Sequence, residues 1–419
     1  MSSGALDAYA HRALFRWSDG MDPEDYTTVT YEVTTGLGEE ETAVAIAMEQ
    51  SAATVRIQGY LAPDGLEAHL ARVRAVTPLH SVAATDAQTF DLETEVYRTG
   101  RQGKLRACRV EIAYPNHLLM GRPGQWLNVL VGEIPRLGFL AELRVTDIEF
   151  PISSLRGPAL GVPGLREHLG VPQSPLLCRS ARPAVGLDLD TLGRLSSDVL
   201  THGFHLVKDD ELQAWPDSSA YHTHVNAMVA TRRRAEEASG EPKGYVANLL
   251  CEPAELAERL RIAESAGASA VLVAPAIQGL GVLPWVRSIS RLPILAHNSF
   301  SEIFTRHPRW RIDPAVYIRM QRALGADWVV TPGPFATPGA ATPEMEACAR
   351  ACWEPLGACL PSLPIIQGGK NPEGLSDYVD AAGGLDFMLI VASWVDSYPD
   401  GLPAGARCFR EAVDALAAA

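Results

Sequence analysis

The sequence lacks an apolar run of about 18 residues, the minimum for a helix that crosses a bilayer, so neither a membrane span nor a membrane partner is expected. Residues 1–17 have no apolar core behind a basic start, and we therefore expect no secretory signal and a cytoplasmic protein. Basic residues are also few, since 36 Lys and Arg accompany 50 Asp and Glu. The resulting formal charge of −14 argues against a nucleic-acid partner, which normally meets a basic surface.

Cysteines are few as well, and their spacing is irregular. The chain has seven, and although Cys348 and Cys352 are four residues apart, no second Cys or His pair completes a zinc-binding pattern. The odd number also excludes a complete set of disulfides. We predict buried free thiols in a reducing compartment.

The first part of the chain, residues 1–150, has the pattern of a small α+β domain. Residues 27–35, 42–50 and 106–113 are strand-like, being rich in β-branched and apolar side chains. Residues 65–77 carry apolar side chains at helical spacing, namely Leu66, Leu70 and Val73. A mixed sheet with helices on one face is the expected arrangement.

The remainder, residues 151–419, alternates short apolar runs with amphipathic helical segments such as 254–266 and 314–324. Such alternation predicts a (β/α)8 barrel, with reacting groups at the C-terminal ends of the strands. An open doubly wound sheet alternates in the same way, but eight runs of fairly even spacing favour the barrel. The runs are residues 176–181, 203–207, 244–249, 270–274, 293–296, 328–331, 364–366 and 387–392.

Four charged residues follow the second run directly: Lys208, Asp209, Asp210 and Glu211. A charge run is usually a solvated turn, but this one stands where a barrel opens. Mg²⁺ prefers hard oxygen ligands, often two carboxylates with substrate oxygens. A lysine can join such a set only after conversion into an oxygen donor.

These four residues resemble the metal-binding motif of the RuBisCO large-chain family, whose lysine is carbamylated by CO₂. The resemblance implies that carbamylated Lys208, Asp210 and Glu211 bind Mg²⁺, with Asp209 in support. It also implies the fold of the family, a C-terminal (β/α)8 barrel preceded by a smaller α+β N-terminal domain.

Further stretches resemble the family in register, from about residue 20 to 415. Residues 181–187 are similar to its Lys-Pro-Lys-x-Gly-Leu stretch, and 239–244 with Asn248 to its Thr-Gly-Glu-x-Lys-Gly…Asn stretch. His297 and Asn298 fall on its His-Arg pair, and residues 367–369 on its Ser-Gly-Gly. Residues of the N-terminal domain also match positions that bind substrate in the family: Glu49, Thr54 and, where the family has Asn, Gln125.

Departures from the family pattern exclude carboxylation. Arg182 replaces a lysine that transfers protons, and an arginine remains protonated at any useful pH. It can still bind a carboxylate or phosphate through two hydrogen bonds. Residues 331–337, the loop in which carboxylases of the family place a lysine over the substrate, contain none. The sequence therefore predicts an enzyme that does not fix CO₂.

This sequence keeps more of the residues of one phosphate site of the family than of the other. In one, the Arg, His and Ser of the family are replaced by Asn298, Val330 and Gln367. The other is partly kept, with Lys370 as an added positive charge nearby. A monophosphate or a sugar acid is therefore expected rather than a bisphosphate. The residues of the second site are Thr54, Gly368, Gly369, Ala392 and Ser393, the last two replacing glycines whose backbone N–H groups donate.

Form IV of the family, the RuBisCO-like proteins, is thus the expected class. Its chemistry implies a Mg²⁺-dependent isomerase or tautomerase that acts on a sugar-derived substrate through an enediolate. The carbamate on Lys208 or His297 would accept the proton. His222 and His224 also follow the metal motif, and their spacing is equally compatible with an incidental position.

Two other functions remain open from the sequence. One is a C–C lyase, either a decarboxylase or a transcarboxylase–hydrolase of a 3-oxo sugar acid phosphate, in which Arg182 and Lys370 hold the carboxylate or phosphate. The other is a non-catalytic binding protein of the same fold, against which the intact set of metal ligands argues.

The resemblance further implies at least a homodimer, because the family completes the barrel mouth of one chain with the N-terminal domain of another. Glu49, Thr54 and Gln125 would then come from the partner. The alternative is that Glu49 and Thr54 end a local element and pack within their own chain.

Overall fold

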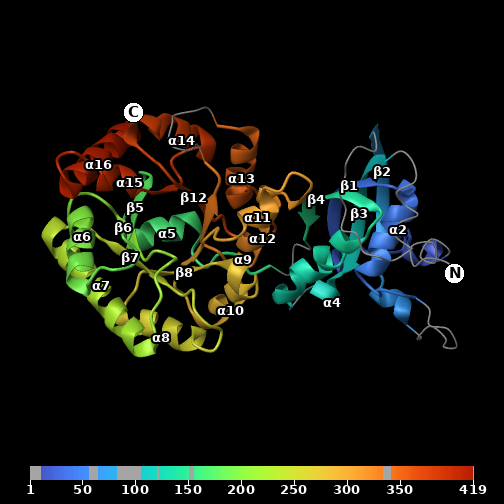
Figure 1. Cartoon of the computed structure of the whole chain (residues 1–419), viewed down its shortest axis with the longest axis horizontal. Helices are drawn as coiled ribbons and strands as arrows, with labels where there is room; N and C mark the ends of the chain where they lie inside the picture. The colour runs from blue at the N-terminus through green and yellow to red at the C-terminus, as the bar shows by residue number, and fades with distance from the viewer. Residues whose placement is uncertain are drawn as a thin grey trace. The chain divides into compact units, whose positions relative to one another are not determined.

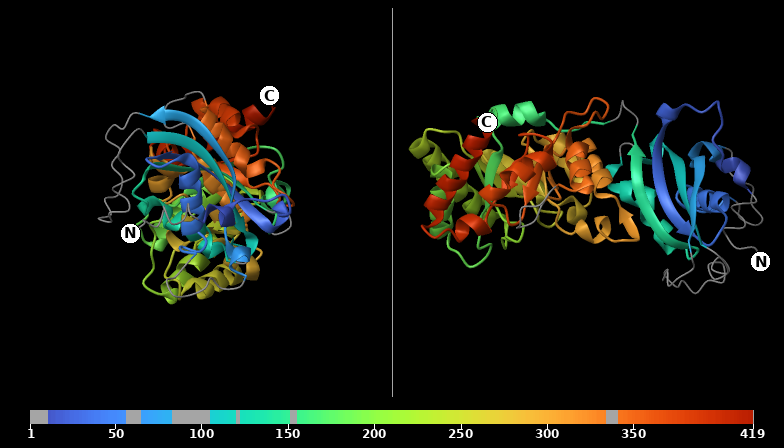
Figure 2. Two further views of the ribbon diagram at one scale, coloured as in Figure 1. Left: turned by 90° about the vertical axis from the view of Figure 1, so that its right-hand side faces the viewer. Right: turned by 90° about the horizontal axis from the view of Figure 1, so that it is seen from above.

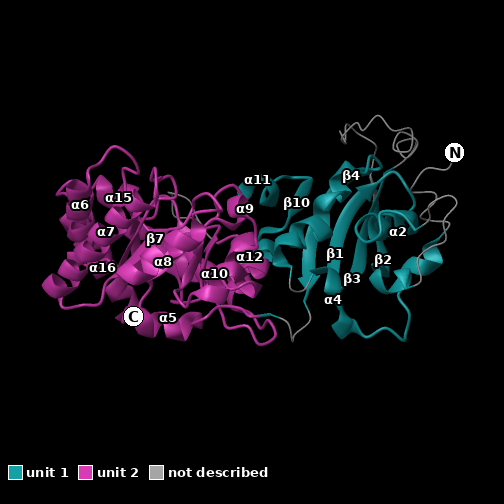
Figure 3. Ribbon diagram, turned by 90° about the horizontal axis from the view of Figure 1, so that it is seen from below, with its two compact units in different colours: residues 1–155, 302–317 teal, residues 156–301, 318–419 magenta. Residues whose placement is uncertain are grey.

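The computed structural model describes residues 11–55, 65–82, 105–119, 122–150, 155–333 and 341–418. It divides into two compact units (Figure 3). Unit 1 contains residues 1–155 and 302–317, and unit 2 contains residues 156–301 and 318–419. The sequence placed one boundary near residue 150. Residues 302–317 belong to unit 1 because residues 310–312 pair with a strand at residues 143–145. This pairing joins distant parts of the chain, so no local sequence pattern predicts it.

Unit 1 is built on a five-stranded sheet in the order β10-β4-β1-β3-β2 (Figures 1 and 2). The pairings of β1, β2, β3 and β4 are antiparallel, and β10 joins β4 in parallel. The strands are β1 Tyr26–Thr35, β2 Arg72–Val82, β3 Leu105–Pro115, β4 Leu140–Glu149 and β10 Trp310–Ile312. Its helices are α2 Glu39–Glu49, α4 Asn116–Leu119 and α11 Glu302–Thr305, with short turns η1 Arg12–Phe15, η2 Pro23–Asp25, η3 Leu66–His69, η5 Pro123–Gln125, η6 Asn128–Gly132 and η7 Ile134–Arg136.

Two local expectations for unit 1 were wrong. Residues 42–49 belong to helix α2 and Gln50 is its C-terminal cap, so this segment is not a strand. The three glutamates at its start complement the helix dipole, and its residues 42–48 are all buried, which hides the helical period. Residues 65–77 form the short turn η3 followed by strand β2, because the apolar spacing of Leu66, Leu70 and Val73 spans two elements rather than one helix.

Unit 2 is a closed barrel of eight parallel strands in the order β11-β12-β13-β5-β6-β7-β8-β9 (Figure 1). Every predicted apolar run overlaps one of these strands, so the barrel is confirmed. The strands are β5 Leu176–Ser180, β6 Leu206–Lys208, β7 Gly244–Asn248, β8 Ala270–Val273, β9 Ile294–Ala296, β11 Trp328–Thr331, β12 Leu363–Gln367 and β13 Met388–Ile390.

The helices between the strands begin and end at residues suited to helix termini. Asp188 and Asp217 cap α6 and α7, and Gly240 and Gly267 end α7 and α8 in the left-handed conformation. The helices are α5 Gly161–Leu169, α6 Leu189–Thr201, α7 Ser218–Ser239, α8 Leu256–Ala266, α9 Pro275–Gln278, α10 Val282–Ile289, α12 Pro314–Ala323 (begun in unit 1), α13 Pro343–Trp353, α14 Leu375–Ala382, α15 Ser393–Asp396 and α16 Leu402–Ala418, with the turn η9 Pro372–Gly374.

Apolar side chains fill the barrel interior below the site. The buried cluster joins strand residues such as Leu206 and Trp328 to Leu165 and Leu169 of α5. Helix α5 therefore closes the end at which the strands begin, and polar side chains are left to the opposite end. No helix among the described residues is long and apolar enough to cross a membrane. All seven cysteines are free thiols, and five of them are buried, as predicted.

Candidate active site

Strands β5 and β6 bring the charged motif and Arg182 together. Ser180 lies opposite Lys208 in the parallel register, and the Ala181 N–H donates to the Lys208 carbonyl at 2.8 Å. Both strands end at this point, so the residues that follow them project from the same end of the barrel. The two stretches singled out from sequence are therefore direct neighbours.

Lys208 is buried, with a residue exposure of 1%. Its Nζ donates to Glu211 Oε2 at 2.9 Å and to the Asp209 carbonyl at 3.0 Å. Burial acts to raise the pKa of Glu211, but the charges of Lys208 and His297 outweigh it and lower that pKa to about 2. Glu211 is therefore a carboxylate at neutral pH.

Asp210 is equally buried and is held by three donors. Its Oδ2 accepts from Arg182 Nε at 2.9 Å and from Ser180 Oγ at 3.1 Å, and its Oδ1 accepts from the Leu212 N–H at 3.1 Å. The Arg182 side chain is 48% exposed, whereas that of Asp210 is 2% exposed. The ion pair thus joins a buried carboxylate to a guanidinium at the mouth.

Asp209 turns away from this group into a separate buried network. Its Oδ1 lies 2.8 Å from His224 Nε2, and its Oδ2 accepts from Tyr245 Oη at 2.7 Å and from the Asn248 N–H at 3.1 Å. Each oxygen is already engaged behind the site, so Asp209 supports the strand end. Of the two histidines on α7, only His224 joins this network, and His222 lies on an exposed part of the helix beside Asn226.

His297 follows β9 and faces Glu211. Its Nδ1 accepts from the Ser299 N–H at 3.2 Å, so the neutral ring carries its proton on Nε2, which lies 3.5 Å from Glu211 Oε2. Burial, reinforced by the charge of Lys208, lowers the pKa of His297 to about 4. The imidazole is therefore neutral at pH 7 and presents an N–H to the carboxylate.

Two amide side chains lie beside His297. Gln367 Nε2 donates to Asn298 Oδ1 at 2.9 Å and lies 3.5 Å from His297 Nε2. Both amides are uncharged, so this side of the mouth presents neutral hydrogen-bonding groups.

The donor set fits a magnesium ion only if Lys208 supplies oxygen. Among the described residues, no three His, Cys, Asp or Glu side chains are grouped closely enough to hold a metal ion. Lys208, however, lies within hydrogen-bonding distance of Glu211, and Asp210 is two residues away on the same strand end. A carbamate on Lys208 would add the missing hard oxygens between these carboxylates.

Residues of the predicted anion site occupy other strand ends. Gly368 and Gly369 follow β12 with positive φ angles of 83° and 57°, and Ala392 and Ser393 lie at the start of α15 after β13. Their backbone groups belong to the same end of the barrel. Residues 334–337 of the lysine-free loop lie outside the described part of the chain.

Lys370 follows the two glycines and is buried against a neighbouring helix. It is 1% exposed, and its Nζ lies 5.2 Å from the centre of the Tyr378 ring on α14. Burial lowers the pKa of this amine to about 8. The amine is thus packed against helix α14.

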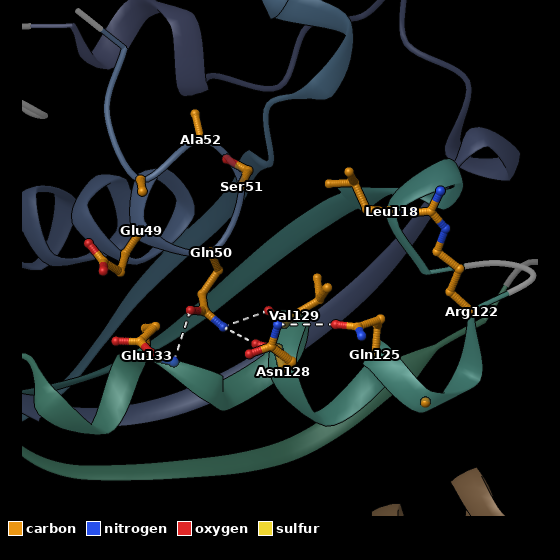
Figure 4. A pocket seen from close by; sticks show the side chains of 12 residues that line it. Glu49, Gln50, Ser51, Ala52, Leu118, Arg122, Gln125, Asn128, Val129 and Glu133 are labelled. Carbon is orange, nitrogen blue, oxygen red and sulfur yellow. Dashed lines mark hydrogen bonds between the residues drawn. The ribbon is translucent and has the colours of Figure 1, made fainter. Parts of the chain in front are cut away.

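Two of the three predicted residues of unit 1, Glu49 and Gln125, line a cavity of about 710 Å³ (Figure 4). Glu49, Gln50, Arg122, Gln125 and Glu133 are among its lining residues. Figure 4 shows Gln50 bridging to the opposite wall: its Nε2 donates to the carbonyls of residues 128 and 129, and its Oε1 accepts from the N–H of residue 133.

Glu49 is paired within its own unit, 2.5 Å from Arg136 Nη2, and Glu133 contacts the same guanidinium. Thr54 is exposed and is not part of the lining. Sequence reasoning missed Glu133 and Arg136, because their three-residue spacing gives no hint that Glu49 lies beside them.

The fold is that of the RuBisCO large chain. The rubisco-like protein from Burkholderia fungorum superposes with a TM-score of 0.82 at 24% identity, covering 94% of this chain and 95% of that one. The dimeric archaeal Rubisco from Hyperthermus butylicus gives a TM-score of 0.82 at 25% identity, over 96% and 93% of the two chains.

Comparison with known sequences identifies the family to which the chain belongs. The family model "Ribulose bisphosphate carboxylase large chain, catalytic domain" matches residues 161–334. A ribulose bisphosphate carboxylase-like protein of Allochromatium vinosum is 33% identical over 76% of this chain and 71% of its own length. Ribulose bisphosphate carboxylase-like protein 2 of Rhodopseudomonas palustris is 30% identical over 98% of this chain and 92% of its own length. The chain belongs to this family of ribulose bisphosphate carboxylase-like proteins.

One relative carries a reaction in its name. The 2,3-diketo-5-methylthiopentyl-1-phosphate enolase of Geobacillus kaustophilus is 28% identical over 75% of this chain and 77% of its own length. The family thus includes a protein named for enolisation as well as proteins named for carboxylation.

Proposed function

We propose that the protein is a magnesium-dependent enzyme that enolises a sugar-derived phosphate or sugar acid and transfers a proton, as an isomerase or tautomerase. The observation that carries this proposal is the convergence of Lys208, Asp210 and Glu211 at the end of β6 with His297 beside them. The enolase name of the Geobacillus kaustophilus relative supports the reaction class.

In this proposal Lys208, as its carbamate, would hold Mg²⁺ together with Asp210 and Glu211. The bound ion would supply Lewis-acid polarisation of the substrate carbonyl, which favours loss of a neighbouring proton to give an enediolate. Because Asp209 is engaged by Tyr245 and His224, it would fix the strand end rather than bind the ion.

The proton acceptor would be a carbamate oxygen of Lys208. His297 carries its own proton on Nε2, so it is suited to donate a hydrogen bond to a substrate oxygen rather than to remove a proton through that nitrogen. Arg182 stays charged and half exposed, and would bind an anionic group of the substrate through its planar fork. Its charge excludes a role as a base.

The uncharged pair Asn298–Gln367 supports a substrate with a neutral, hydroxyl-bearing end on that side of the mouth. The backbone groups around Gly368, Gly369, Ala392 and Ser393 would bind a single phosphate or carboxylate. A bisphosphate fits less well, since the second anion would meet two amides.

Exchange of a substrate proton with solvent tests this function directly. Candidate sugar phosphates and sugar acids are incubated in D₂O with Mg²⁺ and bicarbonate, and deuterium incorporation is followed by NMR. The wild-type protein should label one carbon-bound position, and Lys208→Ala should not. Release of CO₂ without prior exchange would instead identify the lyase reaction, and turnover by Lys208→Ala at the wild-type rate would exclude the mechanism.

We also propose a homodimer or a higher assembly of dimers. Segments that follow β5, β6, β8 and β9 expose apolar side chains at the catalytic end of the barrel, and such exposure is costly unless another surface covers it. The residues are Val185 (73% exposed), Leu212 (74%), Ile277 (53%) and Phe300 (57%). The Rubisco of Hyperthermus butylicus, described as dimeric, has the same fold.

A further inference from the structure

At the ends of β5 and β6, each of the two carboxylates proposed as metal ligands is paired with a cation. Lys208 pairs with Glu211, and Arg182 pairs with Asp210, so two cations face two carboxylates. A divalent cation brought to these two pairs has to compete with both cations, because each carboxylate that it needs already has a positive partner. Binding of the ion therefore requires that at least one of the two cations leave.

The positive charge of Lys208 can be removed by carbamylation of its amine. When CO₂ adds to the amine, a C–N bond forms, the ammonium gives up two protons, and the group becomes an anionic carbamate. This change replaces a positive by a negative charge next to Glu211. It does not remove Arg182 from Asp210, whose carboxylate must also be available.

Of the three donors to Asp210, Arg182 is the one placed to leave. Ser180 is 1% exposed on a barrel strand, and the third donor is the backbone N–H of Leu212. The Arg182 side chain is 48% exposed, so its guanidinium can pass into water at little cost in solvation. It also shares Oδ2 with Ser180, so its departure frees coordination space at that oxygen.

The backbone of Arg182 is anchored independently of its side chain. Arg179 Nη2 donates to the Arg182 carbonyl at 3.0 Å, and Arg179 is itself held by Asp396 at 2.9 Å. The side chain can therefore swing while the end of β5 keeps its position, and the movement needs no rearrangement of the barrel.

We propose that Arg182 is a displaceable counter-ion of Asp210, which competes with the metal ion for this carboxylate. In the metal-free protein it neutralises Asp210. Once displaced, the same guanidinium is free for the anionic group of the substrate, so metal binding precedes and promotes anion binding. The inference rests on the proposed function, in which Asp210 is a metal ligand.

Binding of Mn²⁺ in the absence of substrate tests the proposal without any assay of turnover. Free Mn²⁺ is measured by electron paramagnetic resonance in the presence of bicarbonate. Arg182→Gln should bind Mn²⁺ about three- to fivefold more tightly than wild type, the range expected for loss of a partly exposed ion pair. Arg182→Lys, which keeps the charge, should stay close to wild type. Arg194→Gln, a matched change of charge on exposed α6, should have no effect.

The outcomes separate the two proposals. Equal or weaker binding by Arg182→Gln, with wild type binding Mn²⁺ through Lys208, overturns the counter-ion and leaves the metal site intact. Absence of binding in wild type and in Arg182→Gln overturns both. Crystals of the wild-type protein with and without Mn²⁺ and bicarbonate give a second measurement that does not depend on the variants folding. Arg182 Nε should lie beyond hydrogen-bonding distance of Asp210 in the loaded crystal, and a retained pair would refute the displacement.

Discussion

Replacement of Tyr245 by Phe should destabilise the barrel, because it removes one of the three hydrogen bonds that hold Asp209. The hydroxyl donates to Asp209 Oδ2 at 2.7 Å, and both residues are fully buried. Burial and the nearby carboxylate raise the pKa of Tyr245 well above its ordinary value, so the group remains a donor at all relevant pH values. A buried hydrogen bond to a charged acceptor contributes about 2 kcal/mol. His224 and the Asn248 N–H keep the carboxylate partly satisfied, which should prevent a larger loss.

Tyr221 provides a matched control within the same unit. It is also fully buried, but among the described residues its hydroxyl has no hydrogen-bond partner. Its ring contacts with Trp215 and Arg259 are available to Phe as well. Tyr221→Phe should therefore change stability by less than about 0.5 kcal/mol or increase it slightly, since it removes a buried polar atom without breaking a bond.

Urea denaturation followed by circular dichroism measures the comparison, with equal slopes required for all three proteins. The Tyr245→Phe midpoint should fall clearly below the wild-type and Tyr221→Phe midpoints. If Tyr221→Phe costs as much as Tyr245→Phe, then loss of ring packing or a general sensitivity of this region explains the effect. The assignment of Asp209 to a structural network would then be wrong.

Three further predictions follow from the same structure. Burial lowers the pKa of His205 to about 3, aided by the charges of Arg410 and Lys243. The neutral ring therefore contributes stability that is present above pH 6.5 and is lost as the pH falls toward 3. His205→Gln should flatten the pH dependence of the free energy of unfolding between pH 7 and 4, and an unchanged pH dependence would contradict the assignment. Glu49→Ala and Lys208→Ala homodimers should each be inactive, and after subunit exchange about a quarter of the sites should be wild type and active; a mixture that stays inactive despite demonstrated exchange, or an active monomer by light scattering, would exclude a shared site. Ribulose bisphosphate and radiolabelled bicarbonate should give no acid-stable product above a metal-free blank, because Arg182 cannot act as a base and residues 331–337 supply no lysine.

The barrel could be predicted from the sequence because its information is local. A parallel strand buried on both faces is a short apolar run, and the helix that follows it shows the amphipathic period. The contiguous motif 208–211 was recognisable for the same reason, since four adjacent charges after such a run need no tertiary contact to be noticed. The sequence of unit 1 was less informative about secondary structure. Residues 42–48 of helix α2 are all buried, so their apolar pattern has no period that distinguishes a helix from a strand.

Only the tertiary structure assigned individual partners within these patterns. Asp209 and Asp210 are adjacent and chemically identical, and they differ because one meets Tyr245 and His224 while the other meets Ser180 and Arg182. These partners come from other strands and from α7, at sequence distances that no local pattern encodes.

The same reason explains three other contacts that the sequence did not specify. Lys370 is packed over a ring of α14, Glu49 is paired with Arg136, and residues 302–317 join the sheet of unit 1 through β10. Residue type and periodicity determined which side chains are available and which elements they occupy. Long-range packing decided which charges meet, because the energy of an ion pair or a hydrogen bond depends on a separation of a few ångströms that only the folded chain defines.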